Sequence, residues 1–208
     1  MLNKSEKEEP GSGSGNSGGG GPIAEPGITL VRMTAEFIEA MIERQGGAGH
    51  EFDGVRLWDG WTEESSPWLR VRLTELGAMP ELVTWLLYAI VRRADRQMVG
   101  HVGFHSAPGP PYLHDIAHDG IEIGYSVFAP FKGRGYATAA ASELIGWARR
   151  EHEVREFVAS ISHDNAASIR VAEKLGFKFL REFDPTDPDR EDVYLLHVSD
   201  LARDEADA

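Results

Sequence analysis

The chain has 208 residues, which suits one domain with tails and is long enough to bury a core. It contains no cysteine, so disulfide bonds, thiolate metal sites and a cysteine nucleophile are excluded, and we expect a cytoplasmic protein. The formal net charge of −13 argues against a nucleic-acid partner and mildly favours a cationic substrate.

Residues 1–27 are polar and then rich in glycine and serine, a composition that cannot bury enough apolar area to offset chain entropy. We predict a disordered segment here, native or a linker, and recognise no signal peptide in it. The apolar run at 85–91 is too short to cross a bilayer, so no membrane partner is expected. The folded domain is predicted over 28–198 and an acidic C-terminal tail over 199–208.

The domain begins with a strand over 28–31 and a helix that Thr34 caps, with apolar Phe37, Ile38, Met41 and Ile42 on one face and a stop at 46–47. A second helix is predicted from Ser66 to Gly77. Trp58 and Trp61 lie in the loop between these helices, with Trp68 just beyond. They are candidates for the wall of a substrate pocket, with ordinary core packing as the alternative.

Two strand-like runs at 85–93 and 98–105 are separated by four residues and predict a hairpin. A Pro/Gly-rich loop leads to a third strand over 121–128. The remaining pattern predicts a helix over 137–149, a strand over 157–161, a helix over 166–175 and two final strands over 177–183 and 193–198. This order indicates a mixed α/β sheet.

The stretch PFKGRGYA, residues 130–137, joins the third strand to the helix after it and carries two glycines. The first N–H groups of a helix lack intrahelical partners, so this arrangement is typical of a phosphate site, with a tight turn as the alternative. A Walker loop would need Gly-Lys-Ser/Thr at its end, and a dinucleotide fingerprint a third glycine or alanine at Thr138. Neither motif is present.

Residues 132–137, KGRGYA, resemble the (Gln/Arg)-x-x-Gly-x-(Gly/Ala) signature of the GNAT superfamily of acyl-CoA N-acyltransferases, with Lys132 departing at the first position. Residues 165–177, NAASIRVAEKLGF, are similar to the second signature of that family, in the branch that resembles the RimJ and RimL ribosomal-protein N-terminal acetyltransferases. The order of elements also matches. The resemblance implies an N-acyltransferase fold, with a central, mostly antiparallel sheet flanked by helices.

The resemblance also implies acetyl-CoA as acyl donor, with its pantetheine arm along 121–128 and its pyrophosphate on the loop amides. The third strand is expected to part from the strand at Phe157 and open a wedge for this cofactor. Val127 then offers a main-chain donor to the thioester carbonyl. The cofactor-binding candidates are Val127, Lys132, Gly133, Arg134, Gly135, Tyr136, Ala137, Asn165 and Ser168.

Glu122 is the first candidate for a catalytic base, because strand alternation turns its side chain away from Ile121 and Ile123; a structural ion pair is the alternative. His101 and His105 lie on one face of a strand and are candidates for the acceptor site or for the base. A metal centre on this pair, or on His114 and His118, would need a third ligand that the sequence does not supply, so no metal is predicted.

Ser168 is the second catalytic candidate, as proton donor to the leaving thiolate, by similarity to the Asn-x-x-Ser branch; a first-turn structural serine is the alternative. Asn165 is expected to cap the helix and to reach the pantetheine.

The sequence therefore predicts an acetyl-CoA-dependent N-acetyltransferase that acts on a primary amine, either a protein N-terminus or a small molecule, by direct attack in a ternary complex. A non-catalytic acyl-CoA-binding sensor module is the alternative, and a nicotinamide-dependent oxidoreductase is a weaker one. The identity of the amine and the presence of a homodimer are left open.

Overall fold

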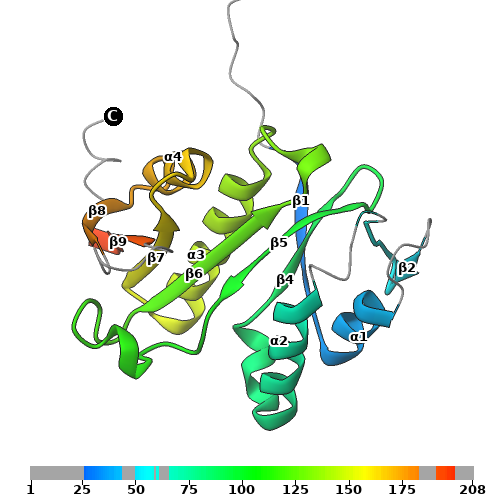
Figure 1. Ribbon diagram of the computed structural model, residues 1–208, viewed down its shortest axis with the longest axis horizontal. Coiled ribbons are helices and arrows are strands. Elements are labelled where there is room, and N and C mark those ends of the chain that lie inside the picture. The colour runs from blue at the N-terminus through cyan, green and yellow to red at the C-terminus, as the bar shows by residue number, and fades with distance from the viewer. Residues whose placement is uncertain (1–25, 44–49, 59, 61–65, 183–190, 200–208) are drawn as a thin grey trace, which may run out of the picture.

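The computed structural model describes residues 26–43, 50–58, 60, 66–182 and 191–199. Its main feature is a seven-stranded sheet in the order β1-β4-β5-β6-β7-β9-β8, shown in Figure 1. All neighbouring strands are antiparallel except β6 and β7. The strands are β1 Ile28–Arg32, β4 Tyr88–Arg92, β5 Met98–Phe104, β6 Ile121–Val127, β7 Glu156–Ser162, β8 Lys178–Glu182 and β9 Glu191–His197. The predicted mixed, mostly antiparallel α/β sheet is confirmed.

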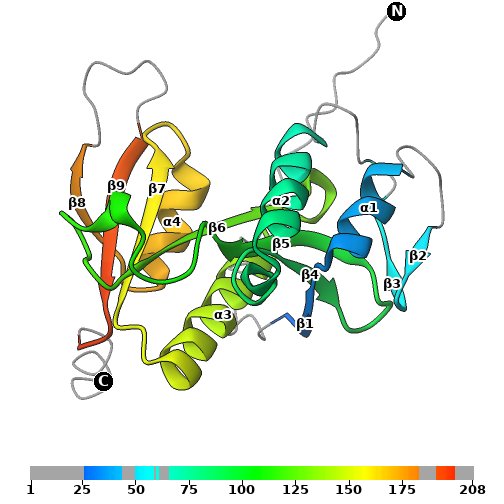
Figure 2. The same ribbon diagram turned by 90° about the horizontal axis from the view of Figure 1, so that it is seen from below.

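Four α-helices cover the two faces of this sheet, and Figure 2 shows α2 and α3 on opposite sides of it. They are α1 Ala35–Glu43, α2 Ser66–Ala78, α3 Tyr136–His152 and α4 Ala166–Lys174. Strand β4 is buried on both faces because its side chains alternate: Ile90 packs in the core under α3, while Ala89 and Val91 pack in the core under α1 and α2. The sheet therefore separates two apolar cores.

Helix α1 begins after the capping residue that the sequence predicts. The main-chain N–H of Phe37 donates to Thr34 Oγ1 at 3.3 Å, so Thr34 caps the helix as predicted. Phe37, Ile38 and Met41 are buried beneath it. The predicted stop at 46–47 lies outside the described residues.

The strand predicted over 85–93 is shorter than expected, because a 3-10 helix, η2 Pro80–Thr84, precedes it. The N–H groups of Trp85 and Leu86 both donate to Leu82 O and are therefore engaged in the helical turn rather than in the sheet. The small hairpin of β2 Glu51–Phe52 and β3 Val55–Arg56 was not predicted. Its Asp53-Gly54 turn, with both residues at positive φ, is a signal that the sequence carries.

Two further 3-10 turns, η3 Pro111–Leu113 and η4 Ala129–Phe131, lie in the loops on either side of β6. Most of the predicted terminal segments 1–27 and 199–208 lies outside the described residues, so the domain limits stay predictions. In the part of the chain that the structure describes, no helix combines the length and apolarity needed to span a membrane.

Candidate active site

Strands β6 and β7 are paired over only two residues before they separate. The parallel register joins Ile121 to Phe157 and Glu122 to Val158 and goes no further, and Figure 1 shows the two strands diverging beyond that point. This is the wedge that the family resemblance implied.

The wedge exposes main-chain groups of β6. The N–H of Phe128 donates to Val99 O and the carbonyl of Glu122 accepts from His105 N, so even-numbered residues of β6 face β5. Antiparallel pairing alternates, so the main-chain groups of Tyr125 and Val127 face the wedge. A ligand that enters the wedge therefore meets a free strand edge.

A cavity of about 320 Å³ occupies the wedge. Segments from β6, the glycine loop, the start of α3 and helix α4 enclose it. Its lining comprises Tyr125, Ser126, Val127, Phe131, Lys132, Gly133, Gly135, Tyr136, Ala137, Thr138, Asn165, Ala167, Ser168, Arg170, Val171 and Lys174. All of the predicted cofactor-binding residues except Arg134 line this one cavity, which we call the wedge cavity.

The glycine loop turns the chain into α3 through two left-handed residues. Gly133 has φ +75° and Gly135, the N-cap of α3, has φ +79°. A residue with a side chain adopts this conformation only at a cost. The first helical hydrogen bond runs from Ala139 N to Gly135 O, so the preceding N–H groups at the start of α3 face the cavity without an intrahelical partner. Together with the helix dipole they form an anion-attracting end.

Helix α4 forms the opposite wall. Asn165 Oδ1 accepts a hydrogen bond from Ser168 N at 3.1 Å, so the predicted capping role of Asn165 is confirmed. Arg170 and Lys174 lie one turn apart on the same helix and line the cavity with Lys132. These three cations were not grouped by the sequence analysis, since only the fold brings α4 against the loop.

Tyr125 links this wall to the sheet and was missed by the sequence analysis. Its hydroxyl donates to the main-chain carbonyl of Ser168 at 3.0 Å, and burial raises the pKa of Tyr125 to about 12, so the phenol stays protonated near neutral pH. Tyr125 also lines a second cavity on β6. Strand alternation could have signalled it, because Tyr125 lies two residues before Val127 and so on the same face.

The second cavity, of about 220 Å³, lies between α2 and the β5–β6 pair, and we call it the α2 cavity. Its lining comprises Trp68, Arg72, Leu86, Leu87, His101, Gly103, Phe104, His105, Gly124 and Tyr125. Both predicted acceptor-site histidines are therefore brought together here. Burial lowers the pKa of His101 to about 4, so this ring is neutral near pH 7, and Trp68 packs against it with ring centroids 4.6 Å apart.

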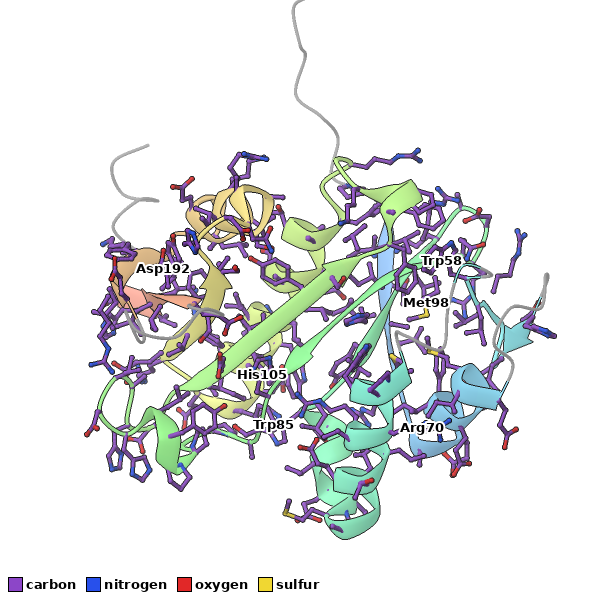
Figure 3. All side chains as sticks on the ribbon, viewed as in Figure 1. Trp58, Arg70, Trp85, Met98, His105 and Asp192 are labelled. Atoms are coloured by element: carbon purple, nitrogen blue, oxygen red, sulfur yellow. The ribbon has the colours of Figure 1, made fainter. Side chains whose placement is uncertain are left out.

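The predicted tryptophans are placed differently. Trp58 stacks on Phe128 with ring centroids 4.5 Å apart and packs against the core under α1 and α2, so it is not among the residues that line either cavity on β6. Figure 3 shows it well apart from His105. Trp61 lies outside the described residues. Trp68, on α2, is instead the tryptophan that lines the α2 cavity, because α2 packs over the end of β5.

Glu122 is the one charged side chain among the described residues that is classed as buried, with 6% of its surface exposed. Its carboxylate lies 3.3 Å from His105 Nδ1, and the side chains of Ser160 and Tyr112 interact with it as well. Burial alone would raise the pKa of Glu122, but the hydrogen bonds from these three side chains and the charge of His105 hold it below its ordinary value. Glu122 is therefore ionised near neutral pH.

A larger cavity, of about 550 Å³, lies at the C-terminal end of β9. The described residues that line it include none of the predicted site residues. Its wall includes Ser199, which is the last residue of the chain that the structure describes. Among the described residues, no group of three or more histidine, aspartate or glutamate side chains is arranged to hold a metal ion. Most of the predicted site residues that the structure describes line one of the two cavities on β6.

The fold and the open wedge between β6 and β7 define an acyltransferase-like architecture. A family model described as the acetyltransferase (GNAT) domain matches residues 29–178. The chain therefore belongs to the GNAT acetyltransferase family.

Known relatives agree with this assignment. The N-acetyltransferase YjdG of Bacillus subtilis, itself uncharacterized, is 31% identical over 114 residues, which cover 55% of this chain and 62% of that protein. The match thus spans less than two thirds of that relative.

Solved structures share the fold at low sequence identity. A GNAT-family acetyltransferase from Bordetella pertussis has a TM-score of 0.56 and 22% identity, covering 81% of this chain and 94% of its own. The RimL ribosomal L7/L12 α-N-protein acetyltransferase, solved in complex with coenzyme A, has a TM-score of 0.58 and 17% identity, covering 85% of this chain and 97% of its own. The predicted likeness in fold to ribosomal-protein acetyltransferases is confirmed.

Proposed function

We propose that this protein transfers an acetyl group from acetyl-CoA to a primary amine by direct attack in a ternary complex. The observation that carries the proposal is that two cavities share a residue of one strand, since Tyr125 lines both. A thioester held in the wedge cavity and an amine held in the α2 cavity then approach each other at β6. Membership of the GNAT family supports the acetyl donor, as does the coenzyme A bound to the RimL structure.

The donor is proposed to lie along the free edge of β6, with its pantetheine amides pairing with Tyr125 and Val127. The N–H of Val127 then donates to the thioester carbonyl and stabilises the oxyanion of the tetrahedral transition state. The pyrophosphate is proposed to rest on the amides of residues 132–137 at the start of α3. Lys132, Arg170 and Lys174 add positive charge around it.

The reaction forms one C–N bond and breaks one C–S bond. A neutral amine attacks the thioester carbon, the amine nitrogen loses a proton, and coenzyme A leaves as a thiolate that takes up a proton. Because Tyr125 stays protonated and its hydroxyl contacts the first turn of α4, it joins Ser168 as a candidate donor to that thiolate. Both side chains line the wedge cavity.

The acceptor is proposed to be a primary amine on a small molecule or at a protein N-terminus. The α2 cavity is lined by the aromatic side chain of Trp68 and the neutral ring of His101, with Arg72 as a cationic side chain. A terminal amine, with a pKa near 8, is about one tenth neutral at pH 7, whereas a lysine-like amine is almost fully charged. A site with only a weak general base therefore suits a terminal amine better than a lysine-like amine.

The test is acetyl-CoA turnover, measured as free thiol release, against amines and peptides with free N-termini, with mass spectrometry to find the acetylated product. The expected result is acceptor-dependent thiol release and a product that has gained one acetyl group. Measurable affinity for coenzyme A with no turnover across the panel would replace the enzyme by the acyl-CoA-binding module.

A further inference from the structure

The buried carboxylate of Glu122 is poorly placed to take a proton from a substrate itself. It is 6% exposed, its Oε2 lies 3.3 Å from His105 Nδ1, and its interactions with His105, Ser160 and Tyr112 each lower its pKa. Tyr112 is protonated in this setting, because burial and the nearby charge of Glu122 raise the pKa of Tyr112 to about 12. A carboxylate that is ionised and enclosed in this way is a weak base with little access to an amine.

His105, in contrast, has access. Its side chain is 44% exposed, it lines the α2 cavity, and its Nδ1 lies 3.3 Å from Glu122 Oε2. An ionised carboxylate can only accept a hydrogen bond, so the contact places the proton of the neutral ring on Nδ1. The other ring nitrogen, Nε2, then carries a free lone pair.

The position of Nε2 is set by a glycine on β6. A Cβ atom at Gly124 would lie 2.8 Å from Nε2, closer than atoms approach in practice, so the imidazole lies over the bare backbone of that residue. Figure 3 shows His105 against β6. Gly124 lines the α2 cavity and is the neighbour of Tyr125, which lines both cavities, so Nε2 lies over the segment of β6 that the two cavities share.

The main chain of His105 is fixed as well. Its N–H donates to Glu122 O at 2.9 Å, which extends the β5–β6 ladder, and its carbonyl accepts from Arg72 Nη1 at 3.3 Å. The ring is thus held by the carboxylate of Glu122 and the backbone by two further partners. A side chain held in this way is preorganised for proton transfer.

We infer that His105 Nε2 is the base that accepts the proton of the attacking amine, and that Glu122 acts as a positioning residue which orients the ring through Nδ1. The inference rests on the proposed acetyl transfer at this site. As the C–N bond forms, the amine proton moves to Nε2, and the imidazolium later passes a proton to the departing thiolate or to solvent. This differs from a mechanism in which the glutamate itself takes the proton.

The ring of His105 is in direct contact with the carboxylate of Glu122 on β6. Arg72 on α2 donates to the main-chain carbonyl of His105 and pairs with Glu75 at 2.8 Å, and the phenol of Tyr112 on η3 interacts with Glu122. Replacing this carboxylate by an amide leaves the imidazole of His105 in place as the base, so the rate profile should keep its acid limb.

The experiment compares kcat and kcat/KM from pH 5 to 9 for the full chain and the variants His105→Gln and Glu122→Gln. The acceptor is spermidine, kanamycin or a short peptide amide with an N-terminal serine, whichever the unaltered protein acetylates fastest. We expect His105→Gln to lower kcat by about 10²- to 10³-fold and to abolish the acid limb. Glu122→Gln is expected to lower kcat about 10-fold and to keep an acid limb.

The reverse pattern overturns the inference: a limb that survives in His105→Gln and disappears in Glu122→Gln assigns the base to the glutamate. His118→Gln is the matched control, because His118 is exposed in the loop after η3 and contacts Asp119, which is also exposed. It should retain the full rate. Equal affinity of the variants for coenzyme A confirms that they are folded.

A second measurement does not depend on turnover. In the full chain labelled with 15N-histidine, long-range 1H–15N spectra near pH 8 report which ring nitrogen carries the proton. We expect His105 to be protonated on Nδ1, and a proton on Nε2 would overturn the inference. If none of the three acceptors is acetylated while Nδ1 carries the proton, acetyl transfer to such amines is what fails, and the His105–Glu122 arrangement stands.

Discussion

The two cavities on β6 are built in different ways. The wedge cavity is formed by segments close together in the sequence, 125–138 and 165–174, and its proposed ligand contacts are largely main-chain groups. The α2 cavity combines side chains from α2, the η2–β4 turn, β5 and β6, which are distant in the sequence. A site built from main-chain groups can be recognised from a short sequence motif, because it requires glycines and a helix cap. A site built from side chains of distant elements has no such motif.

The largest effect is expected in the wedge cavity, where Gly135→Val should weaken coenzyme A binding by at least about 30-fold. A β-branched residue strongly disfavours φ +79°, so the loop must reorient and the amides at the start of α3 turn away from the phosphates. Isothermal titration with coenzyme A measures the change. Gly77→Val, at an open position on α2, is the matched control and should bind normally. Unchanged affinity in folded Gly135→Val would show that the loop does not hold the cofactor.

In the α2 cavity the corresponding test is Gly124→Ala, which should lower kcat by about 10- to 100-fold while coenzyme A affinity stays within a factor of about three. The added methyl group collides with the imidazole of His105, which can swing away, so the base is lost and the fold is kept. Steady-state kinetics and thermal unfolding separate the two effects. A normal rate would mean that the ring need not lie over Gly124.

Gly100→Ala marks the contrast with a structural glycine. A Cβ atom there would lie 2.2 Å from the main-chain oxygen of Ser126, which cannot move without breaking the β5–β6 pairing. The substitution should therefore lower the unfolding temperature more than Gly124→Ala does. Equal destabilisation by the two variants would mean that Gly124 is as important for the fold as Gly100.

The part of the fold that the sequence predicts is the part with repeating local signals. The strand at β6, the capped helix α1 and the glycine loop before α3 each follow from alternation, a Thr cap or a Gly pair. The late start of β4 was not predicted because Trp85 and Leu86 are apolar and suit a strand, while the η2 turn takes their N–H groups. These hydrogen bonds depend on the residues that precede the strand-like run at 85–93, so the run itself does not predict them.

The site divides in the same way. Residues 132–137, Asn165 and Ser168 were found from motifs, and the structure gathers most of them around the wedge cavity. Arg72 was not predicted as a site residue, since nothing near it in the sequence indicates that α2 covers the end of β5. Trp58 and Trp68 were both candidates for the pocket wall, and only their packing distinguishes them: Trp58 stacks on Phe128, whereas Trp68 packs against His101.

A smaller effect is expected at the junction of the two cavities, where Tyr125→Phe should lower kcat by about 5- to 10-fold. The change removes the hydrogen bond to Ser168 O and one candidate donor to the thiolate, and it keeps the ring. Ser168→Ala in parallel distinguishes the two donors. A larger loss in Ser168→Ala than in Tyr125→Phe would assign proton donation to the serine.

The smallest expected effect concerns stability rather than rate, and it tests whether His101 is a neutral wall of the α2 cavity. Burial lowers the pKa of His101 from 6.5 to about 4, so between these values the unfolded chain binds a proton that the folded chain does not. Stability therefore falls as the pH decreases through this window, with a slope of at most about 1.4 kcal/mol per pH unit.

Urea unfolding at several pH values between 4 and 7 measures this slope. His101→Phe should flatten it, because the phenyl ring takes no proton, whereas His118→Gln, at an exposed position, should keep it. The carboxylate of Glu122 contributes only at lower pH, since its pKa lies below the ordinary 4.5. An unchanged slope in His101→Phe would mean that the ring is charged in the folded protein. The α2 cavity would then hold a second cation beside Arg72 and would disfavour a positively charged acceptor.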